Sequence, residues 1–438
     1  DNTHPTITTV AVAGATENGY GVASTYVVTI TPSETLSAAP TLTVTGGSIT
    51  TAGAASNANY VYTVTPTDAD EAMTVVVAVG GAADSAGNTN AAASNNFGWT
   101  HDTTAPTATI ASSEVTTGGS INEAVTFTVT FSEQMTGIAD GDFTVAGATC
   151  VLSGYTVTTA NTVFTQICTP DTNGETTTIS VASGAGTDPA GNSNSAATDF
   201  TFTYDTTVPT VSSIAVTGVT SGQYGNSATY QVIVTASETL EDAPTLSLAG
   251  GSITTAGAGS TSDTVWTYTF TPTDNDEAVT IDIQAGGITD DAGNDNTAAA
   301  TQFAFTHDQT DPTVVITSTS VNTGGSHNGA LTMIFTFSEE MTGIANGDFT
   351  FTNCAAGAYS VQTANTVFHQ VCTPDTNGAT VTVAVAASKG TDPAGNNNAA
   401  ATDFTFTYET TAPTVVITSD DVTTGGRHNG ATTMIFTF

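Results

Sequence analysis

Residues 124–131 read AVTFTVTF, with an apolar side chain at every second position and threonine between them. This period of two is the pattern of a β-strand with one buried and one exposed face. Threonine suits the exposed face because it is β-branched and polar. The same alternation returns nearby in three segments: TVFTQICT (162–169), TTTISVAS (176–183) and DFTFTYD (199–205). These runs predict antiparallel sheets, and helix signals are nearly absent.

The pattern repeats along the chain with a period of about one hundred residues, which is the length of a whole β-sandwich domain. Two markers carry this period, a turn glycine (Gly87, Gly191, Gly293, Gly395) and a linker proline (Pro5, Pro106, Pro209, Pro312, Pro413). Each period holds about seven strand-like runs. We therefore predict an all-β fold: tandem Ig-like Greek-key β-sandwiches of about seven strands each, arranged end to end.

The period divides the chain into four complete Ig-like units and the start of a fifth. Repeats 1 to 4 are residues 1–103, 104–206, 207–309 and 310–410, and residues 411–438 begin the fifth. Repeats 1 and 3 share GGSITTAG and lack cysteine, and we call them type A. Repeats 2 and 4 share CTPDTNG, and we call them type B; the fifth begins like type B. Because the chain opens at a linker and stops within an expected second strand, we expect it to be part of a longer array. A terminal strand donated to a neighbouring molecule is the alternative.

The charge balance is extreme because basic residues are missing. Lys389 and Arg427 are the only two, against 40 acidic residues, and the formal net charge is −38. Nucleic acid and anionic membrane surfaces are thereby excluded as partners, since both are bound by clustered Lys and Arg. No apolar run reaches the roughly 18 residues of a membrane helix, so we expect no membrane insertion in this segment. Divalent cations are the natural neutralisers of such a surface, unless the acidity serves only solubility.

The four cysteines form two pairs with equal spacing, Cys150 with Cys168 and Cys354 with Cys372, and each second cysteine opens the CTPDTNG segment. Equal spacing in two copies of one repeat predicts a disulfide inside each type B repeat. Disulfides are typical of chains outside the cytoplasm. A reduced, buried pair is the alternative.

Strand alternation gathers acidic residues at one end of each sandwich. Around repeat 2, Asp102 of the preceding linker comes before the first strand, Glu133 follows the second, and Asp188 and Asn192 lie in the turn between the sixth and seventh. All four then fall at the end where the repeat begins. Carboxylates without basic partners repel one another, and calcium, which takes six to eight oxygen ligands, relieves this. The sequence therefore predicts calcium at the joints between repeats.

The same set appears in the other three repeats. The equivalent residues are Asp1, Glu34, Asp84 and Asn88 in repeat 1, Asp205, Glu238, Asp290 and Asn294 in repeat 3, and Asp308, Glu339, Asp392 and Asn396 in repeat 4. Glu409 holds the linker position of the fifth. The alternative is that Asp and Asn serve as turn formers and Glu as an exposed strand end. Three further acidic segments, DADE (68–71), DNDE (274–277) and DGD (140–142), are interpreted as solvated turns.

No motif of a known catalytic site is found, whether a P-loop, HExxH or GxSxG. His101 and His307 are interpreted as exposed strand ends. Paired carboxylates occur in glycosidases, but their recurrence at every joint argues against a catalyst, which needs one site. We therefore expect the chain not to be an enzyme.

Three segments together resemble a known family: D-x-A-G-N before an aromatic strand, D-T-T-x-P-T, and F-S-E-x-M-T-G. They are similar to the tandem bacterial Ig-like domains of large repeat adhesins and biofilm-associated surface proteins. The resemblance implies Ig-like sandwiches on an extracellular chain, often with calcium at the joints. We expect a non-catalytic stalk or extender of an adhesin or surface fibre. Its partners would be further repeats or neighbouring copies, and a cell-surface or biofilm ligand. The alternative is a subunit of a filament linked by strand donation.

Overall fold

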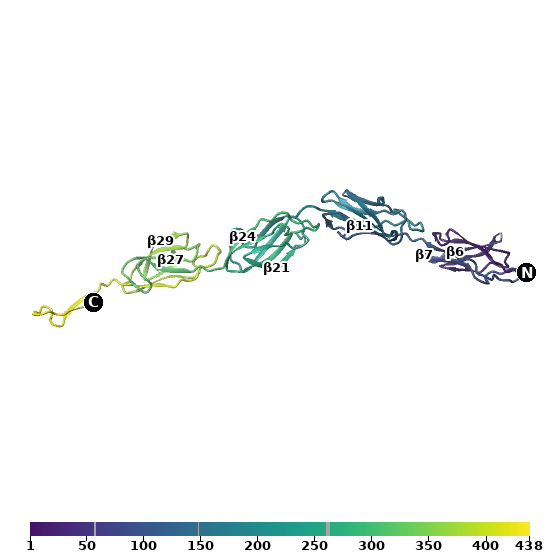
Figure 1. Cartoon of the computed structure of the whole chain (residues 1–438). Helices are drawn as coiled ribbons and strands as arrows, with labels where there is room; N and C mark the ends of the chain where they lie inside the picture. The colour runs from purple at the N-terminus through teal and green to yellow at the C-terminus, as the bar shows by residue number, and fades with distance from the viewer. Residues whose placement is uncertain (57, 148, 260–262) are drawn as a thin grey trace. The chain divides into compact units, whose positions relative to one another are not determined.

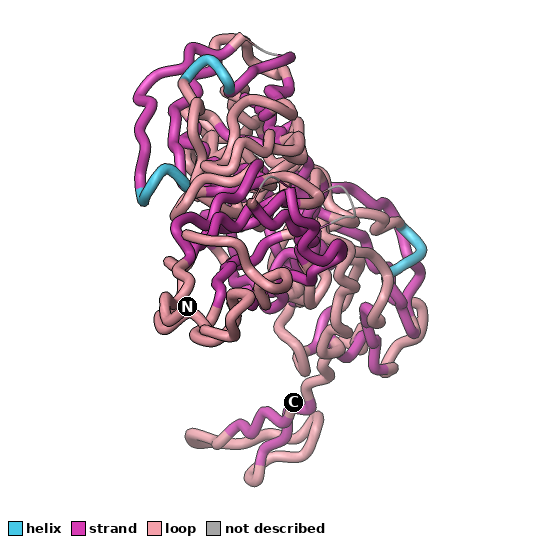
Figure 2. Tube along the Cα trace, turned by 90° about the vertical axis from the view of Figure 1, so that its right-hand side faces the viewer, coloured by secondary structure: helices cyan, strands magenta, loops and turns pink. Residues whose placement is uncertain are grey.

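The computed structural model describes residues 1–56, 58–147, 149–259 and 263–438. Strands dominate the described part of the chain (Figures 1 and 2), and none of its helices has the length and apolarity needed to cross a membrane. The chain forms two compact units. One comprises Asp1–Val208 with Asp291–Asn294, and the other comprises Pro209–Asp290 with Asp295–Phe438.

Repeats 1 and 2 each contain eight strands among the described residues. Repeat 1 has β1 (Ile7–Ala13), β2 (Tyr20–Gly21), β3 (Tyr26–Pro32), β4 (Leu42–Thr45), β5 (Gly47–Ser56), β6 (Asn59–Pro66), β7 (Asp70–Val77) and β8 (Phe97–Asp102). Repeat 2 has β9 (Ala108–Ser112), β10 (Ser120–Ile121), β11 (Val125–Phe131), β12 (Phe143–Gly147), β13 (Cys150–Thr158), β14 (Val163–Pro170), β15 (Thr176–Val181) and β16 (Phe200–Tyr204), with the short helices η1 (Asp140–Asp142) and α1 (Thr159–Thr162).

Repeats 3 and 4 have the same order of strands. Repeat 3 has β17 (Val211–Val216), β18 (Tyr224–Gly225), β19 (Tyr230–Ala236), β20 (Ser247–Ala249), β21 (Gly251–Gly259), β22 (Val265–Pro272), β23 (Asp276–Asp282) and β24 (Phe303–Asp308). Repeat 4 has β25 (Val314–Ser318), β26 (Ser326–His327), β27 (Leu331–Phe337), η2 (Asn346–Asp348), β28 (Phe349–Thr352), β29 (Cys354–Thr363), β30 (Val367–Pro374), β31 (Thr380–Val385) and β32 (Phe404–Tyr408). Beyond it, β33 (Val416–Ser419) and β34 (Met434–Thr437) form an antiparallel hairpin.

Two four-stranded sheets make each sandwich. In repeat 2 the orders are β13-β14-β11-β9 and β10-β16-β15-β12, and every pairing is antiparallel except that of β10 with β16. This is the two-sheet arrangement of an Ig-like sandwich. The predicted fold class is therefore confirmed. The two-residue strand β10 and its equivalents add to the seven expected strands.

The core lies between the two sheets and follows the alternation in the sequence. In β11, Val125, Phe127 and Val129 are fully buried, and the threonines between them face outward. Phe127 meets Phe143 of the opposite sheet edge to face, with ring centroids 6.0 Å apart. Burial of one such side chain contributes about 1.5–3 kcal/mol. One hydrophobic cluster of this kind spans both sheets in each of the four repeats.

Thr177 is a polar side chain at an inward-facing position of repeat 2. Thr177 in β15 is fully buried, and its Oγ1 has no hydrogen-bond partner among the described residues. Valine, which has nearly the same shape, occupies the matching position of β31, at Val381. Thr177→Val is therefore expected to raise the free energy of unfolding of repeat 2 by about 1–2 kcal/mol, because a buried unpaired hydroxyl is removed.

Chemical denaturation of the full chain measures this effect on the transition of repeat 2. Val381→Thr is the matched reverse substitution and should destabilise repeat 4 by a similar amount. A lower stability of Thr177→Val would contradict the prediction.

Candidate metal site

Three acidic residues from separate elements lie together at the start of the repeats. We call these groups the Asp1 cluster (Asp1, Glu34, Asp84), the Asp102 cluster (Asp102, Glu133, Asp188) and the Asp308 cluster (Asp308, Glu339, Asp392). In each, one oxygen from every carboxylate lies within 4.8 Å of the other two. The remaining predicted set is divided between the two compact units, since Asp205 belongs to one and Glu238 and Asp290 to the other, and it stays a prediction.

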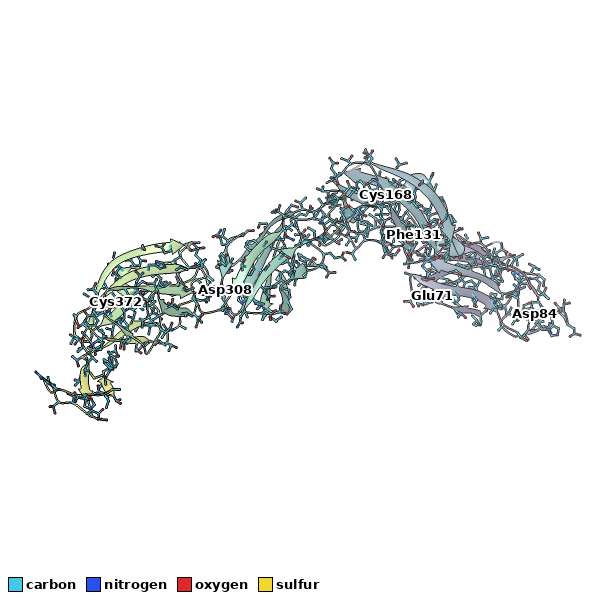
Figure 3. The ribbon with its side chains drawn as sticks, turned by 60° about the vertical axis from the view of Figure 1, so that its left-hand side comes forward. Glu71, Asp84, Phe131, Cys168, Asp308 and Cys372 are labelled. Atoms are coloured by element: carbon cyan, nitrogen blue, oxygen red, sulfur yellow. A yellow bond between two sulfur atoms is a disulfide. The ribbon has the colours of Figure 1, made fainter. Side chains whose placement is uncertain are left out.

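The linker aspartate is fixed by the strand that it ends and by its own turn. Asp102 is the last residue of β8, is 6% exposed, and accepts a hydrogen bond at Oδ1 from the Thr104 N–H at 3.0 Å. Asp308, labelled in Figure 3, ends β24 in the same way and accepts from the Thr310 N–H at 2.9 Å. Such a bond to the residue two positions later is the Asx turn typical of aspartate. Both carboxylates are therefore held before any ligand arrives.

The glutamate follows a serine that anchors the first strand. The Ser132 N–H donates to the Thr107 carbonyl at 2.9 Å, and the Thr107 N–H donates to Ser132 Oγ at 3.0 Å. This reciprocal pair joins the end of β11 to the chain just before β9, and Glu133 follows directly. The same pair links Ser33 with Thr6, Ser237 with Thr210, and Ser338 with Thr313. In the S-E dipeptide, the serine therefore fixes the start of the first strand, and the glutamate contributes a carboxylate to the cluster.

The turn aspartate is the most buried member of the Asp102 cluster. Asp188 is 1% exposed, and its Oδ1 accepts the Asn192 N–H at 2.9 Å. The turn closes because Gly191 has φ +96°, a backbone conformation that only glycine adopts without strain. The sequence A-G-N therefore encodes the local geometry of this carboxylate.

The turn asparagine ties the linker to the turn. Asn192 Nδ2 donates to Asp188 Oδ2 at 2.8 Å and to the main-chain carbonyl of Asp102 at 3.0 Å. The same bond to the linker carbonyl recurs at Asn88 with Asp1 (3.2 Å), at Asn294 with Asp205 (2.9 Å) and at Asn396 with Asp308 (2.9 Å). The predicted role of the amide oxygen as a ligand stays a prediction. The fastening role of the amide nitrogen was not foreseen.

A second asparagine of the same turn was also missed by the sequence reasoning. Asn194 is 2% exposed, accepts the Gly186 N–H at Oδ1, and donates through Nδ2 to the carbonyls of Ala182 and Ser195. Its equivalents Asn90, Asn296 and Asn398 are buried as well. The signal was present, since G-N-x-N occurs in all four repeats. These amides hold the turn that carries the aspartate.

Burial and mutual repulsion change the acidity of these groups. Burial, followed by the charges of Asp102 and Asp188, raises the pKa of Glu133. Burial raises the pKa of Asp102 as well, with a contribution from Asp188. For Glu339, burial and then Asp308 and Asp392 raise the pKa to about 7. Carboxylates that resist ionisation in this way gain from a nearby cation.

Asp70 of the DADE segment and Asp276 of the DNDE segment are exposed, as expected for solvated turns, and each adds a charge beside a linker aspartate. Asp70 lies opposite Asp102 in the β7–β8 pairing and raises the pKa of both Asp102 and Glu133. Asp276 does the same beside Asp308. Glu71, in contrast, accepts the N–H groups of Thr67 and Asp68 within its own turn.

The two histidines beside the linker aspartates are buried, which corrects their interpretation as exposed strand ends. His101 and His307 are 4% and 2% exposed. Their Nδ1 atoms lie 2.7 Å from the Tyr26 hydroxyl and 2.8 Å from the Tyr230 hydroxyl. Burial follows from alternation, because each histidine sits two residues after a core aromatic side chain. They pack with the core and lie next to the cluster.

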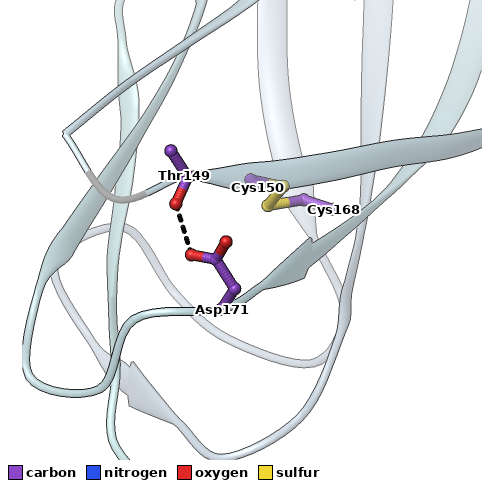
Figure 4. Close-up of a disulfide and its surroundings, with 4 residues drawn as sticks. All are labelled: Thr149, Cys150, Cys168 and Asp171. Atoms are coloured by element: carbon purple, nitrogen blue, oxygen red, sulfur yellow. Dashed lines mark hydrogen bonds between the residues drawn. A yellow bond between two sulfur atoms is a disulfide. The ribbon is translucent and has the colours of Figure 1, made fainter.

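The predicted cysteine pairs are confirmed as disulfides, Cys150–Cys168 and Cys354–Cys372. The first joins β13 to β14 close to the turn that leaves β14. There, Thr149 Oγ1 donates to the Asp171 carboxylate (Figure 4). The described part of the chain has no free cysteine. Sulfur ligands for a soft metal are therefore not offered by these residues.

The donor set fits a hard divalent cation. Calcium binds oxygen at 2.3–2.6 Å, so oxygens within about 5 Å of one another can share one ion. The clusters satisfy this spacing. Carbonyl oxygens and water can complete the six to eight ligands that calcium takes. Transition metals prefer imidazole or thiolate, which these clusters do not supply.

Comparison with known sequences gives a family for the disulfide-containing repeats. A sequence profile described as bacterial Ig-like domain matches residues 102–204 and 308–408. Both segments are bacterial Ig-like domains. The resemblance inferred from the residues is thereby confirmed. No curated relative matches the chain in sequence.

Solved structures with some likeness to the chain contain Ig domains in tandem. A titin I-band fragment, I67-I69, is 10% identical over 70% of this chain and 100% of that chain, with a TM-score of 0.31. Sidekick-1 immunoglobulin domains 1-4 are 10% identical over 94% and 100%, with a TM-score of 0.24. Domains 4-9 of the surface layer protein SbsC are 14% identical over 77% and 46%, with a TM-score of 0.18. Overlaps this low carry no argument about function.

Bacterial Ig-like domains in tandem with disulfides are typical of extracellular structural or adhesion proteins. Tandems of this fold are typically non-catalytic. These coarse statements follow from the family and the covalent structure.

Proposed function

We propose that the chain is a non-catalytic extracellular stalk or extender, part of a repeat adhesin or surface fibre, whose joints are stiffened by calcium. The observation that carries the proposal is the Asp102 cluster and its counterpart at Asp308. Each joins a carboxylate at the end of one repeat to two carboxylates of the next. A cation bound by all three would link the two repeats across their connecting segment.

The stiffening follows from electrostatics. Without a cation, the carboxylates of Asp102, Glu133 and Asp188 repel one another, and Asp70 adds to the repulsion. Movement of the linker that takes Asp102 away from the other carboxylates then lowers the electrostatic free energy. With calcium bound, the same charges become ligands, and movement of the linker breaks metal–oxygen bonds. Magnesium is less suited because it requires near-ideal octahedral geometry and keeps its water ligands.

Differential scanning calorimetry and small-angle X-ray scattering of the full chain test this function. Calcium is expected to raise the melting temperature and to reduce interdomain flexibility relative to chelator. Magnesium at the same concentration is the control and should do so less. At a free calcium concentration one hundred times the dissociation constant, binding adds about 2.7 kcal/mol to the free energy of unfolding of a domain that binds calcium only when folded. Identical melting and scattering in calcium and chelator would rule the function out.

We propose further repeats or neighbouring copies of the same chain as partners, with a cell-surface or biofilm ligand at another part of the assembly. The near absence of Lys and Arg supports this, because it disfavours nucleic acid and anionic membranes. Location at the cell surface or in a secreted fibre fits the two disulfides.

A second candidate function is a subunit of a filament assembled by strand donation. The β33–β34 hairpin favours it, since Ile417, Met434 and Phe436 are all at least half exposed. Apolar strands of this kind can pair with a sheet edge of another molecule. Sedimentation velocity over a range of protein concentrations decides between them. Concentration-dependent polymers that are lost when residues 411–438 are removed would support the filament, and a monomer throughout would exclude it.

A further inference from the structure

Type B repeats hold their outgoing linker with an asparagine side chain. Asn173, in the turn between β14 and β15, accepts the Thr206 N–H at Oδ1 at 2.5 Å and donates through Nδ2 to Thr207 Oγ1 at 2.9 Å. Asn377 makes the same two bonds with Thr410 and Thr411, at 2.6 and 3.1 Å. In both type B repeats, one asparagine side chain therefore forms hydrogen bonds with two consecutive linker residues. We call this pair of bonds, made by Asn173 or Asn377, the clasp.

The turn that presents this amide is itself fixed against the last strand. Gly174 has φ +78° and donates its N–H to the Tyr204 carbonyl at 2.7 Å. Gly378 has φ +75° and donates to the Tyr408 carbonyl at the same distance. The N-G dipeptide thus places the asparagine beside the point where the linker leaves the sandwich.

Type A repeats hold the linker differently, with main-chain atoms. The Thr103 N–H donates to the Ala69 carbonyl at 2.8 Å, and the Gln309 N–H donates to the Asn275 carbonyl at 2.7 Å. No side chain of the turn is needed for these two bonds. The side-chain clasp is therefore a property of the type B repeats.

The disulfide anchors the start of the clasping turn. Cys168 lies three residues before Asp171, and the Asp171 carboxylate accepts the hydroxyl of Thr149, the neighbour of Cys150 (Figure 4). Both strands that lead into this region, β13 and β14, are consequently joined covalently and by a hydrogen bond. The turn carrying Asn173 begins from this fixed point.

The linker threonines that bind the asparagine also orient the acidic residue of the linker. The Thr207 N–H donates to Asp205 Oδ1 at 2.8 Å, and the Thr411 N–H donates to Glu409 Oε1 at 2.6 Å. We propose that Asn173 and Asn377 are positioning residues that hold the linker, and with it the acidic residue presented to the following repeat, independently of any cation. The inference rests on the proposed function only in treating Asp205 and Glu409 as candidate ligands.

Hydrogen exchange of the full chain tests these side-chain bonds to the linker, with peptides covering residues 203–209 and 407–412 as the readout and a peptide covering Gln309 for the control. Asn173→Ala is expected to speed exchange of the Thr206 amide at least tenfold, because its acceptor is lost. Asn377→Ala should do the same at Thr410, and it provides a second test if the first variant folds poorly. Asn275→Ala is the matched control. Because Gln309 is held by the main chain of Asn275, exchange at Gln309 should not change.

Each variant is measured in calcium and in chelator, with exchange of the Phe127 and Phe335 amides as the check that the sandwiches remain folded. Faster exchange at Thr206 in both conditions supports the clasp, even if calcium has no effect on the wild-type chain and the proposed function fails. Unchanged exchange at Thr206 in Asn173→Ala and at Thr410 in Asn377→Ala would overturn the inference. Equal acceleration at Gln309 in Asn275→Ala would overturn it as well.

Discussion

Glu339→Gln is expected to stabilise repeat 4 in the absence of calcium at pH 8 and to weaken its stabilisation by calcium. Burial, followed by the charges of Asp308, Asp392 and Asp276, raises the pKa of Glu339 from 4.5 to about 7. Glutamine keeps the size of the side chain and removes the charge that causes the repulsion. It also replaces one of the two ligand oxygens of the carboxylate with a poor donor to calcium.

The sign of the pH dependence follows from the raised pKa. In the cation-free protein, folded Glu339 binds a proton more tightly than the unfolded chain does. The free energy of unfolding therefore falls as the pH rises from about 4.5 to about 7, and the loss is complete above that range. A pKa difference of this size corresponds to about 3 kcal/mol at most. Glu339→Gln should remove most of this pH dependence, and saturating calcium should reverse it.

Thermal unfolding in chelator and in calcium, at pH 5 and pH 8, measures both effects. Glu340→Gln is the matched control, because it changes the net charge equally at the next residue, which is exposed and accepts a hydrogen bond from Asn365. It should leave both the pH dependence and the calcium response intact. If the two variants behave alike, Glu339 has no special place in the Asp308 cluster.

The fold was predictable because its signals are periodic. Alternation in segments such as residues 124–131 states which side chains enter the core, and Phe127 and its neighbours are buried accordingly. Strand direction then brings Glu133 and Asp188 to one end without knowledge of any distance. The equal spacing of the cysteine pairs predicted both disulfides. These inferences need only the alternation of apolar and polar residues, the direction of the strands and the spacing of the cysteines.

Details that depend on which atom of a side chain is used were not predictable. The sequence predicts the side-chain oxygen of Asn192 as a calcium ligand, but it is the Nδ2 atom that forms the hydrogen bonds to Asp188 and to the linker. Asp70 is exposed as expected, but its place opposite Asp102 follows only from the β7–β8 register. Alternation after the buried Trp99 accounts for the burial of His101, but its partner, the Tyr26 hydroxyl, could not be predicted. Strand register and side-chain rotamers determine these contacts, and neither can be deduced from the composition or the period of the sequence.

The second large effect is expected from the disulfides. Cys150→Ala combined with Cys168→Ala should lower the free energy of unfolding of repeat 2 by about 3 kcal/mol, because a cross-link over 18 residues restricts the unfolded chain. Reduction of the wild-type chain should give a similar loss without removing the sulfur atoms from the core. Calorimetry of the full chain measures both, and the cysteine-free type A repeats serve as the internal control.

The disulfide prediction also separates the two roles assigned to the bond. If it acts only on the unfolded chain, its removal lowers stability but leaves exchange at Thr206 unchanged in the folded protein. If it also anchors the turn that carries Asn173, exchange at Thr206 rises under conditions where repeat 2 is fully folded. The fixed hydrogen bond between Thr149 and Asp171 beside the disulfide leads us to expect the second result. A loss of less than about 1 kcal/mol in both the double variant and the reduced protein would contradict the entropic account.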